Sequence, residues 1–212
     1  MEQFRASSRR ESYGAFKLIK VGILGDIGSG KSFVAKQFGY PVFNADKEVS
    51  DIYKNDKSCY NKIKNKFPKF IKSKILKKNE LGSVIKENNQ NLKKISDIVH
   101  PIVRKRMHIF FKKNKRKMMV VLDIPLLVEN KLYDKNFYLI FVQSNRNEIN
   151  KRLKKRPFYN KAIINSLRKS QKSLAYKKKI SNFIINNNFK LISLKKNIKM
   201  IKRKILDERN SS

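Results

Sequence analysis

Short apolar runs alternate with longer amphipathic segments along most of this chain. Five of the runs have the length and composition of buried strands, namely residues 18–24, 40–44, 118–123, 137–142 and 182–186. Strands that alternate with helical segments form a parallel sheet with helices on both faces. The pattern therefore predicts an α/β fold built on a five-stranded parallel sheet flanked by helices.

The segments between the runs carry apolar residues at helical spacing. Residues 33–38 begin one helix, a lysine-rich region of about 47–117 is helical, and residues 193–206 close the chain as a helix. Pro68, Gly82 and Pro101 divide the lysine-rich region, and we place Pro101 at the first position of a long helix, where its missing N–H costs nothing. A basic stretch from residue 146 to 176 is also helical in pattern.

Polar residues gather where the predicted strands end. In open parallel sheets, ligands bind beyond the carboxyl ends of the strands. We therefore expect one cleft to be formed by the residues that follow these ends, which are Gly25–Ser32, Asp46, Asp123–Glu129 and Asn186–Asn187.

The composition favours one folded domain, residues 17–212, after a disordered extension of residues 1–16. A chain of 212 residues, 40% of them hydrophobic, can bury a single sizeable core. No apolar run has the length of a membrane span, and residues 1–16 lack the apolar centre of a secretory signal. The single cysteine, Cys59, fits a reducing compartment. We expect a cytoplasmic protein with no membrane partner.

The charge is strongly basic, with 52 Lys+Arg against 16 Asp+Glu and a net charge of +36. A nucleic-acid partner is indicated when such residues form a stripe or patch. Here lysine is spread through every segment together with abundant Asn and Ile, which indicates a compositional bias on solvated faces. We therefore expect no nucleic-acid partner, and a monomer or weak oligomer. The basic field would still attract a phosphorylated small molecule.

The sequence Gly25-Asp26-Ile27-Gly28-Ser29-Gly30-Lys31-Ser32 fits the phosphate-binding pattern G-x-x-x-x-G-K-[ST], the P-loop. It lies between a predicted strand and a predicted helix, so backbone N–H groups and the helix dipole would converge on an anion. Lys31 would reach the β- and γ-phosphates of ATP, and the Ser32 hydroxyl would bind Mg²⁺. We expect ATP to bind residues 25–32 together with Phe33.

Further motifs, in this order, resemble those of the dephospho-coenzyme A kinase family over about residues 20–205. The family reads G-G-I-G-S-G-K-S at residues 25–32 and Asp-Ala-Asp where this chain has Asn44-Ala45-Asp46. Its His-Pro pair is matched by His100-Pro101, with Arg104 nearby, and its D-x-P-L-L-x-E by residues 123–129. Its R-x-x-x-R is matched by Arg152 and Arg156, and its Asn at the end of a late strand by Asn186-Asn187. The resemblance implies a P-loop kinase fold, with an inserted helical acceptor-binding region at about 47–117 and a helical lid at about 145–178.

The same resemblance implies a reaction. The γ-phosphoryl group of ATP would pass to the ribose 3′-hydroxyl of dephospho-CoA to give coenzyme A and ADP, with ATP as co-substrate and Mg²⁺ as metal. Asp46 would orient the attacking hydroxyl and accept its proton. The alternative role of Asp46 is an N-cap of the helix that follows.

The resemblance also implies roles for residues around the rest of the predicted cleft. Asp123 would bind Mg²⁺ through water or contact the acceptor; its alternative is a structural bond to the P-loop backbone. Pro125 and Leu126 would form an apolar wall, and His100 and Arg104 would contact the acceptor nucleotide. The lid residues Arg152 and Arg156, which share a helix face, would close over the phosphates unless they are simply a solvated basic face. Asn187 would lie near the adenine of ATP, its alternative being a turn residue.

Two residues depart from the family pattern. Asn44 replaces an aspartate and keeps hydrogen-bonding capacity while losing a charge. Asp26 replaces a P-loop glycine and adds a carboxylate beside an anion site. Our hypothesis is that Asp26 faces the acceptor, so that Asp26→Gly would alter the affinity for dephospho-CoA more than that for ATP.

Two other functions stay open on the sequence. Another P-loop nucleoside or nucleotide kinase would share the sheet and the lid but differ in the acceptor pocket. A basic nucleic-acid-binding P-loop protein would show basic residues interleaved with aromatic residues and an acidic pair after a strand. Here Asp123 has no adjacent second acid and tryptophan is absent.

Overall fold

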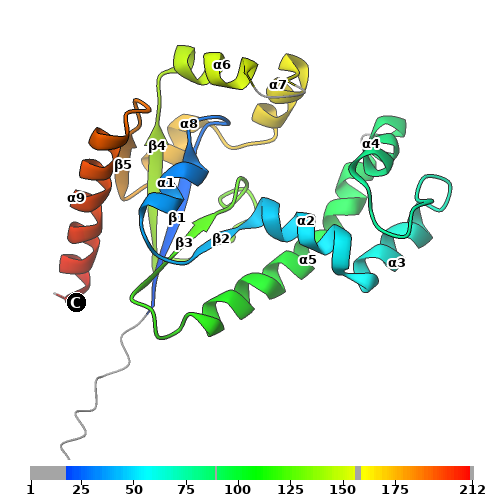
Figure 1. The fold of residues 1–212 in the computed structure, drawn as a ribbon, viewed down its shortest axis with the longest axis horizontal. Helices are drawn as coiled ribbons and strands as arrows, with labels where there is room; N and C mark the ends of the chain where they lie inside the picture. The colour runs from blue at the N-terminus through cyan, green and yellow to red at the C-terminus, as the bar shows by residue number, and fades with distance from the viewer. Residues whose placement is uncertain (1–17, 89, 156–158, 211–212) are drawn as a thin grey trace, which may run out of the picture.

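The computed structural model describes residues 18–88, 90–155 and 159–210 (Figure 1). The expectation for residues 1–16, and the role given to Arg156, lie outside this part of the chain. Within it, no helix is both long and apolar enough to cross a membrane.

The centre of the molecule is a parallel sheet of five strands in the order β2-β3-β1-β4-β5. The strands are β1 (Ile19–Gly25), β2 (Val42–Asn44), β3 (Met119–Asp123), β4 (Phe137–Gln143) and β5 (Phe183–Asn186). Each lies within two residues of a predicted run, so the predicted sheet is confirmed. Because β1 lies in the middle, between β3 and β4, the P-loop that follows it emerges at the centre of the carboxyl edge.

Alternation along β1 gives the sheet two apolar faces. Ile19, Val21 and Ile23 pack in one buried cluster with the helices α1 (Lys31–Gln37) and α9 (Leu191–Asn210). Leu24 belongs to the cluster on the other face. Gly22 points to that second face, where a Cβ would lie 2.5 Å from a methyl group of Leu127. The close approach brings the loop after β3 down onto the sheet and fixes it next to the P-loop.

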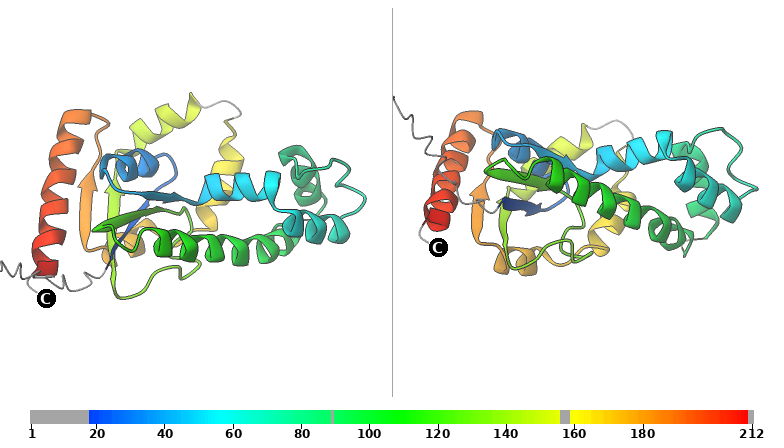
Figure 2. Two further views of the ribbon diagram at one scale, coloured as in Figure 1. Left: turned by 60° about the horizontal axis from the view of Figure 1, so that its bottom comes forward. Right: turned by 90° about the horizontal axis from the view of Figure 1, so that it is seen from below.

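A group of helices extends from one side of the sheet (Figures 1 and 2). They are α2 (Ala45–Asn55), α3 (Lys57–Lys66), α4 (Lys78–Glu87) and α5 (Gln90–Lys113). Pro101 lies inside α5, which corrects its expected place at the start of a helix. The buried face of α5, with Ile95, Val99, Val103 and Met107, continues on both sides of the proline. The helix therefore keeps its course because burial of this face outweighs the lost hydrogen bond.

Three short helices follow one another along the chain between β4 and β5. They are α6 (Arg146–Lys154), α7 (Lys161–Lys169) and α8 (Leu174–Lys179). Figure 1 shows α6 and α7 above the end of the sheet, in the region where the sequence predicts a lid. α8 returns to the sheet and packs on β1.

Candidate active site

The P-loop turns through three glycines with a positive φ, Gly25, Gly28 and Gly30, and at the first and last of them a side chain would also clash. Gly25 and Gly30 have φ values of 144° and 91°. A Cβ at Gly25 would lie 2.7 Å from the carbonyl oxygen of Val142, and one at Gly30 would lie 2.6 Å from Nδ2 of Asn187. The glycines therefore let the loop pack against the ends of β4 and β5 at the N-terminus of α1, the position where helices bind anions.

Side chains from the neighbouring strand ends hold the loop in place. Asn187 Nδ2 donates to the carbonyl oxygen of Ser29 at 2.8 Å, and Ser144 Oγ donates to the same oxygen at 3.0 Å. Asn187 Oδ1 also accepts the N–H of Phe189 at 3.0 Å. Asn187 is buried, so these bonds are shielded from water. Asn187 therefore acts as a structural clamp on the loop in this structure.

Lys31 begins α1, and its side chain folds back over the loop. Its Nζ donates to the carbonyl oxygens of Gly25 at 3.1 Å and Asp26 at 2.8 Å. Burial lowers the pKa of Lys31 to about 8, and the ammonium group of Lys177 adds to this effect, whereas the Asp123 carboxylate opposes it. An anion that displaced water here would restore the charged form.

Asn44, Asp46 and Asp123 meet where β2 and β3 end. Asn44 caps α2, because its Oδ1 accepts the N–H of Lys47 at 2.9 Å. The cap is thus Asn44 rather than Asp46, and the alternative role of Asp46 is wrong. Asn44 Nδ2 donates to Asp123 Oδ2 at 2.6 Å. An aspartate at position 44 would place two carboxylates in this contact, so Asn44 removes a repulsion and orients Asp123.

Asp46 lies in the first turn of α2 with its carboxylate open to two cavities. Burial and the neighbouring Asp123 carboxylate raise the pKa of Asp46, while Lys31 acts in the opposite direction. A raised pKa makes the carboxylate a better proton acceptor.

The first cavity lies over the P-loop and measures about 520 Å³. It brings together most of the residues predicted to bind ATP and Mg²⁺, and its lining includes Ile27, Gly28, Gly30, Lys31, Ser32, Phe33, Asp46, Asp123, Pro125, Leu126 and Arg152. Gly25 and Ser29 shape the loop without lining this cavity. Ser32 and Asp123 line the same space, and Asn44 donates to Oδ2 of Asp123.

The second cavity, about 170 Å³, lies between α2, α5 and the loop after β3. His100, Arg104, Pro125, Leu126 and Asp46 are among its lining residues. Burial, followed by the charge of Arg104, lowers the pKa of His100, so the imidazole is neutral at pH 7 and can donate or accept a hydrogen bond. The residues predicted to contact the acceptor therefore share one pocket, and Asp46, Pro125 and Leu126 join it to the cavity over the P-loop.

Arg152 extends from α6 toward the phosphate cavity. Its guanidinium lies 4.3 Å from the centroid of the Phe189 ring, which holds it by a cation–π contact. Sequence reasoning missed Phe189, which has a φ of 60° and gives no signal as a single aromatic residue in a loop.

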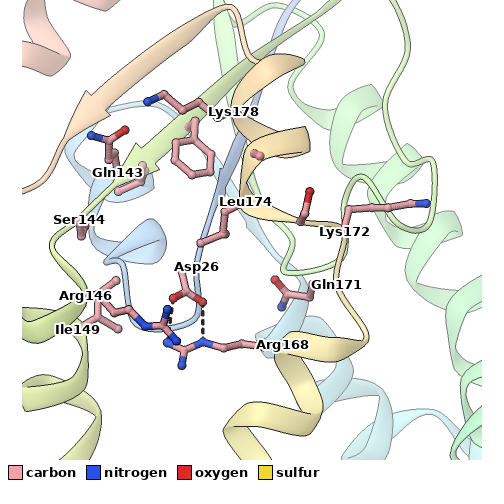
Figure 3. A pocket seen from close by; sticks show the side chains of 14 residues that line it. Asp26, Gln143, Ser144, Arg146, Ile149, Arg168, Gln171, Lys172, Leu174 and Lys178 are labelled. Atoms are coloured by element: carbon pink, nitrogen blue, oxygen red, sulfur yellow. Dashed lines mark hydrogen bonds and ion pairs between the residues drawn. The ribbon is translucent and has the colours of Figure 1, made fainter.

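Asp26 does not line the pocket of Asp46 and His100. Its carboxylate accepts from Arg168 of α7 at two atoms, Nε to Oδ1 at 3.0 Å and NH2 to Oδ2 at 2.8 Å (Figure 3). The pair lies in a third cavity, with Arg146, Gln143 and Gln171 among its other lining residues. The expectation that Asp26 faces the acceptor is therefore not met. Arg168 was missed because one basic residue in so basic a chain carries no signal.

A buried ion pair joins the loop after β3 to α8, in the region where the sequence predicts a lid. Glu129 Oε1 accepts from Lys177 Nζ at 2.9 Å and from the N–H of Lys172 at 2.8 Å. Lys177 also donates to Gln171 Oε1 at 2.9 Å, and only 1% of its side chain is exposed. The last residue of the D-x-P-L-L-x-E motif thus ties the loop after β3 to α8. Lys177 could not be singled out among so many lysines.

The proteins that are similar to this chain include several dephospho-CoA kinases. The family model for dephospho-CoA kinase matches residues 19–192. The dephospho-CoA kinase of Wolbachia pipientis wMel is 33% identical over 171 residues, which are 78% of this chain and 87% of that protein. The crystal structure of TT1252 from Thermus thermophilus superposes with a TM-score of 0.75 at 24% identity, covering 91% of this chain and 98% of that one. The dephospho-CoA kinase from Campylobacter jejuni gives 0.59 at 20% identity over 88% and 96%.

Proposed function

Because this chain belongs to the dephospho-CoA kinase family, we propose that it transfers the γ-phosphoryl group of ATP to the ribose 3′-hydroxyl of dephospho-CoA. The observation that carries the proposal is the position of Asp46, which lines both the phosphate cavity and the pocket of His100 and Arg104. A carboxylate at this junction can reach a hydroxyl in one cavity and a phosphoryl group in the other.

The donor side would bind the triphosphate through the P-loop N–H groups, Lys31 and Arg152. Mg²⁺ would be held by the Ser32 hydroxyl and, through water, by Asp123. The described residues contain no group of three or more His, Cys, Asp or Glu side chains able to hold a metal. This donor set fits Mg²⁺, which keeps several waters and shares substrate phosphates as ligands. When bound, Mg²⁺ would neutralise charge on the transferring phosphoryl group.

The acceptor side would place the ribose against Asp46, between His100, Arg104 and the apolar wall of Pro125 and Leu126. As the 3′-oxygen bonds to the γ-phosphorus, the bond from that phosphorus to the β–γ bridging oxygen breaks and ADP leaves. The hydroxyl proton passes to Asp46. Because burial and Asp123 raise the pKa of Asp46, kcat/KM should fall on the acid side at a pH above the ordinary range of aspartate.

The direct test is ATP consumption by the purified protein with dephospho-CoA, adenosine, AMP or no acceptor. We expect rapid turnover with dephospho-CoA alone and coenzyme A as the product. Equal turnover with and without dephospho-CoA would exclude the proposal, and faster turnover with adenosine or AMP would favour another nucleoside or nucleotide kinase. Tight, steeply salt-dependent binding of DNA or RNA would instead support the nucleic-acid alternative. We also propose a cytoplasmic location and a monomeric or weakly associating state.

A single substitution tests the role of Asp46. Asp46→Asn should lower kcat by about 10²–10⁴-fold while ATP binding is retained, because the amide cannot accept the proton. Asp51→Asn is the matched control, since Asp51 lies on the same helix, paired with Arg106 and away from both cavities. Retained turnover in Asp46→Asn would remove Asp46 as the base.

A further inference from the structure

Asp26 and Arg168 join the P-loop to the lid through a pair of parallel hydrogen bonds. The distances are 3.0 Å and 2.8 Å, and both side chains are largely removed from solvent, with 12% and 23% exposure. Asp26 Oδ1 also accepts the N–H of Ile27 at 2.7 Å. The carboxylate is thus fixed to the loop backbone on one side and to α7 on the other, in the bidentate geometry that gives an ion pair its strength.

Residue 26 also touches the lysine that would contact the phosphates. Lys31 Nζ donates to the carbonyl oxygen of Asp26 at 2.8 Å. The backbone of one residue therefore orients Lys31, while its side chain holds Arg168. A movement of α7 that pulled on Arg168 would act directly on the part of the loop that carries Lys31.

The described side chains of α7 add little buried packing to this attachment. No α7 residue whose burial the structure describes is buried, and Leu167 is 47% exposed. Leu167 nevertheless lines the phosphate cavity, as do Ser170 and Gln171 just after the helix. These three residues follow or flank Arg168, so the position of this wall depends on where Arg168 is held.

The charges around the pair explain why Asp26 needs its partner. An unpaired carboxylate in the P-loop would repel the triphosphate, since Asp26 is close enough to act on the charge of Lys31. Arg168 neutralises it from α7, and Arg146 of α6 lines the same cavity and points toward it (Figure 3). Lys172 and Lys178 also line this cavity, whereas Glu129 and Lys177 form their own pair.

We propose that Asp26 and Arg168 are a positioning pair that holds α7 against the P-loop, so that Leu167, Ser170 and Gln171 close the phosphate cavity and keep water from the γ-phosphate. The inference rests on the proposed kinase function. It assigns the unusual P-loop aspartate to ATP retention and water exclusion, and gives it no part in acceptor binding. Arg168 acts through the lid and does not take part in the chemistry.

A double-mutant cycle tests the pair. The variants are Asp26→Gly, Arg168→Gln and the two together, with KM for ATP, kcat and the ratio of ATP hydrolysis to phosphoryl transfer as readouts. Arg168→Gln should raise KM for ATP and the hydrolysis ratio about tenfold or more, because it leaves Asp26 unpaired. Asp26→Gly should have the smaller effect. The double variant should resemble Asp26→Gly to within about threefold, with a coupling of at least about fivefold. Additive effects of the two substitutions would overturn the proposal.

Conservative and control variants separate positioning from simple loss of structure. Arg168→Lys keeps the charge but not the paired bonds, so it should recover part of the lost ATP affinity. Full recovery would show that charge alone matters and would also overturn the proposal. The exposed pair Lys151 and Glu148 on α6 is the control, and its cycle of Gln substitutions should show no coupling in any of the three readouts.

The affinity for ATP is also measured with no acceptor present, by displacement of a fluorescent ATP analogue. This readout does not depend on which acceptor the protein uses. The coupling between Asp26 and Arg168 should appear there as well. If dephospho-CoA is not the acceptor but the coupling persists, the proposed function fails and the positioning pair stands. If dephospho-CoA is the acceptor and the coupling is absent, the pair fails alone. Thermal unfolding of each variant identifies any that has lost the fold, and in that case Arg168→Lys and Asp26→Asn supply the cycle.

Discussion

The P-loop and the lid helix α7 face each other across the phosphate cavity, yet they are held in different ways. The P-loop is fixed by buried bonds from Asn187 and Ser144 to the carbonyl oxygen of Ser29. α7 contributes no buried residue among those described and is fastened to the loop by Arg168. The site is therefore preorganised at the P-loop, which would bind the triphosphate, and adjustable at α7, which would cover it. Such a division suits a kinase that must admit two substrates and then exclude water.

The base of the lid belongs with the fixed part. Glu129 and Lys177 form a buried ion pair between the loop after β3 and α8. The lid therefore has a firm base at α8, and α6 packs through the buried Ile149 and Leu153, whereas no described residue of α7 is buried. Substitutions at the base of the lid, at the P-loop and at α6 would test this contrast.

The largest effect on stability is expected at the base of the lid. Glu129→Ala leaves the buried Lys177 ammonium without its carboxylate, which should lower the free energy of unfolding by about 3–5 kcal/mol. Urea denaturation measures the change. Glu148→Ala, which breaks the exposed pair with Lys151, should cost no more than about 1 kcal/mol. Equal losses of unfolding free energy in Glu129→Ala and Glu148→Ala would show that the buried pair at the base of the lid stabilises the fold no more than the exposed pair on α6.

A smaller loss is expected when the clamp on the P-loop is removed. Asn187→Ala leaves the Ser29 carbonyl with one bond fewer and the Phe189 N–H without its partner, which should cost about 1–3 kcal/mol of stability and raise KM for ATP. Denaturation and steady-state kinetics give the two values. The neighbouring Asn186, whose side chain is exposed, supplies the control Asn186→Ala. If Asn187→Ala changes neither value, the loop is not held by this clamp.

The pH dependence of ATP capture tests the interior of the P-loop. Burial lowers the pKa of Lys31 to about 8, so the side chain is cationic below that pH and neutral above it. Above about pH 8, kcat/KM for ATP should therefore decline, approaching tenfold for each further pH unit. At saturating ATP the bound phosphates favour the charged form, so kcat should hold to higher pH. A kcat/KM that stays constant to pH 10 would contradict the assignment.

Most of the fixed part of the site could be predicted from the sequence. The five strands, the P-loop, and the placement of Asp46 and Asp123 at neighbouring strand ends follow from apolar runs and the geometry of parallel sheets. The prediction that Pro101 begins a helix was wrong, because the buried face of α5 continues on both sides of the proline and its burial outweighs the lost hydrogen bond. A local rule could not weigh that packing.

The connections between fixed and adjustable parts could not be predicted. The pair of Asp26 and Arg168 joins residues 142 positions apart, and that of Glu129 and Lys177 joins the loop after β3 to α8. Among 52 basic residues, no local feature marks the two that are paired. Asn187 was predicted near the adenine of ATP, and the bonds that its amide makes to the P-loop and to Phe189 could not be foreseen. These choices depend on three-dimensional proximity, which the spacing of residues does not encode.

The smallest effect is expected at the contact between Arg152 and the ring of Phe189, where α6 touches the fixed part of the site. Phe189→Leu removes the ring but keeps an apolar side chain, and both residues have the same difficulty with a φ of 60°. The cation–π contact is worth about 0.5–1 kcal/mol, so kcat/KM for ATP should fall by about two- to fivefold with little change in unfolding. Phe189→Tyr keeps an aromatic face and should retain the wild-type value. If Tyr reduces kcat/KM as much as Leu, the ring does not position Arg152, and α6 must be held over the phosphates by its own packing through Ile149 and Leu153.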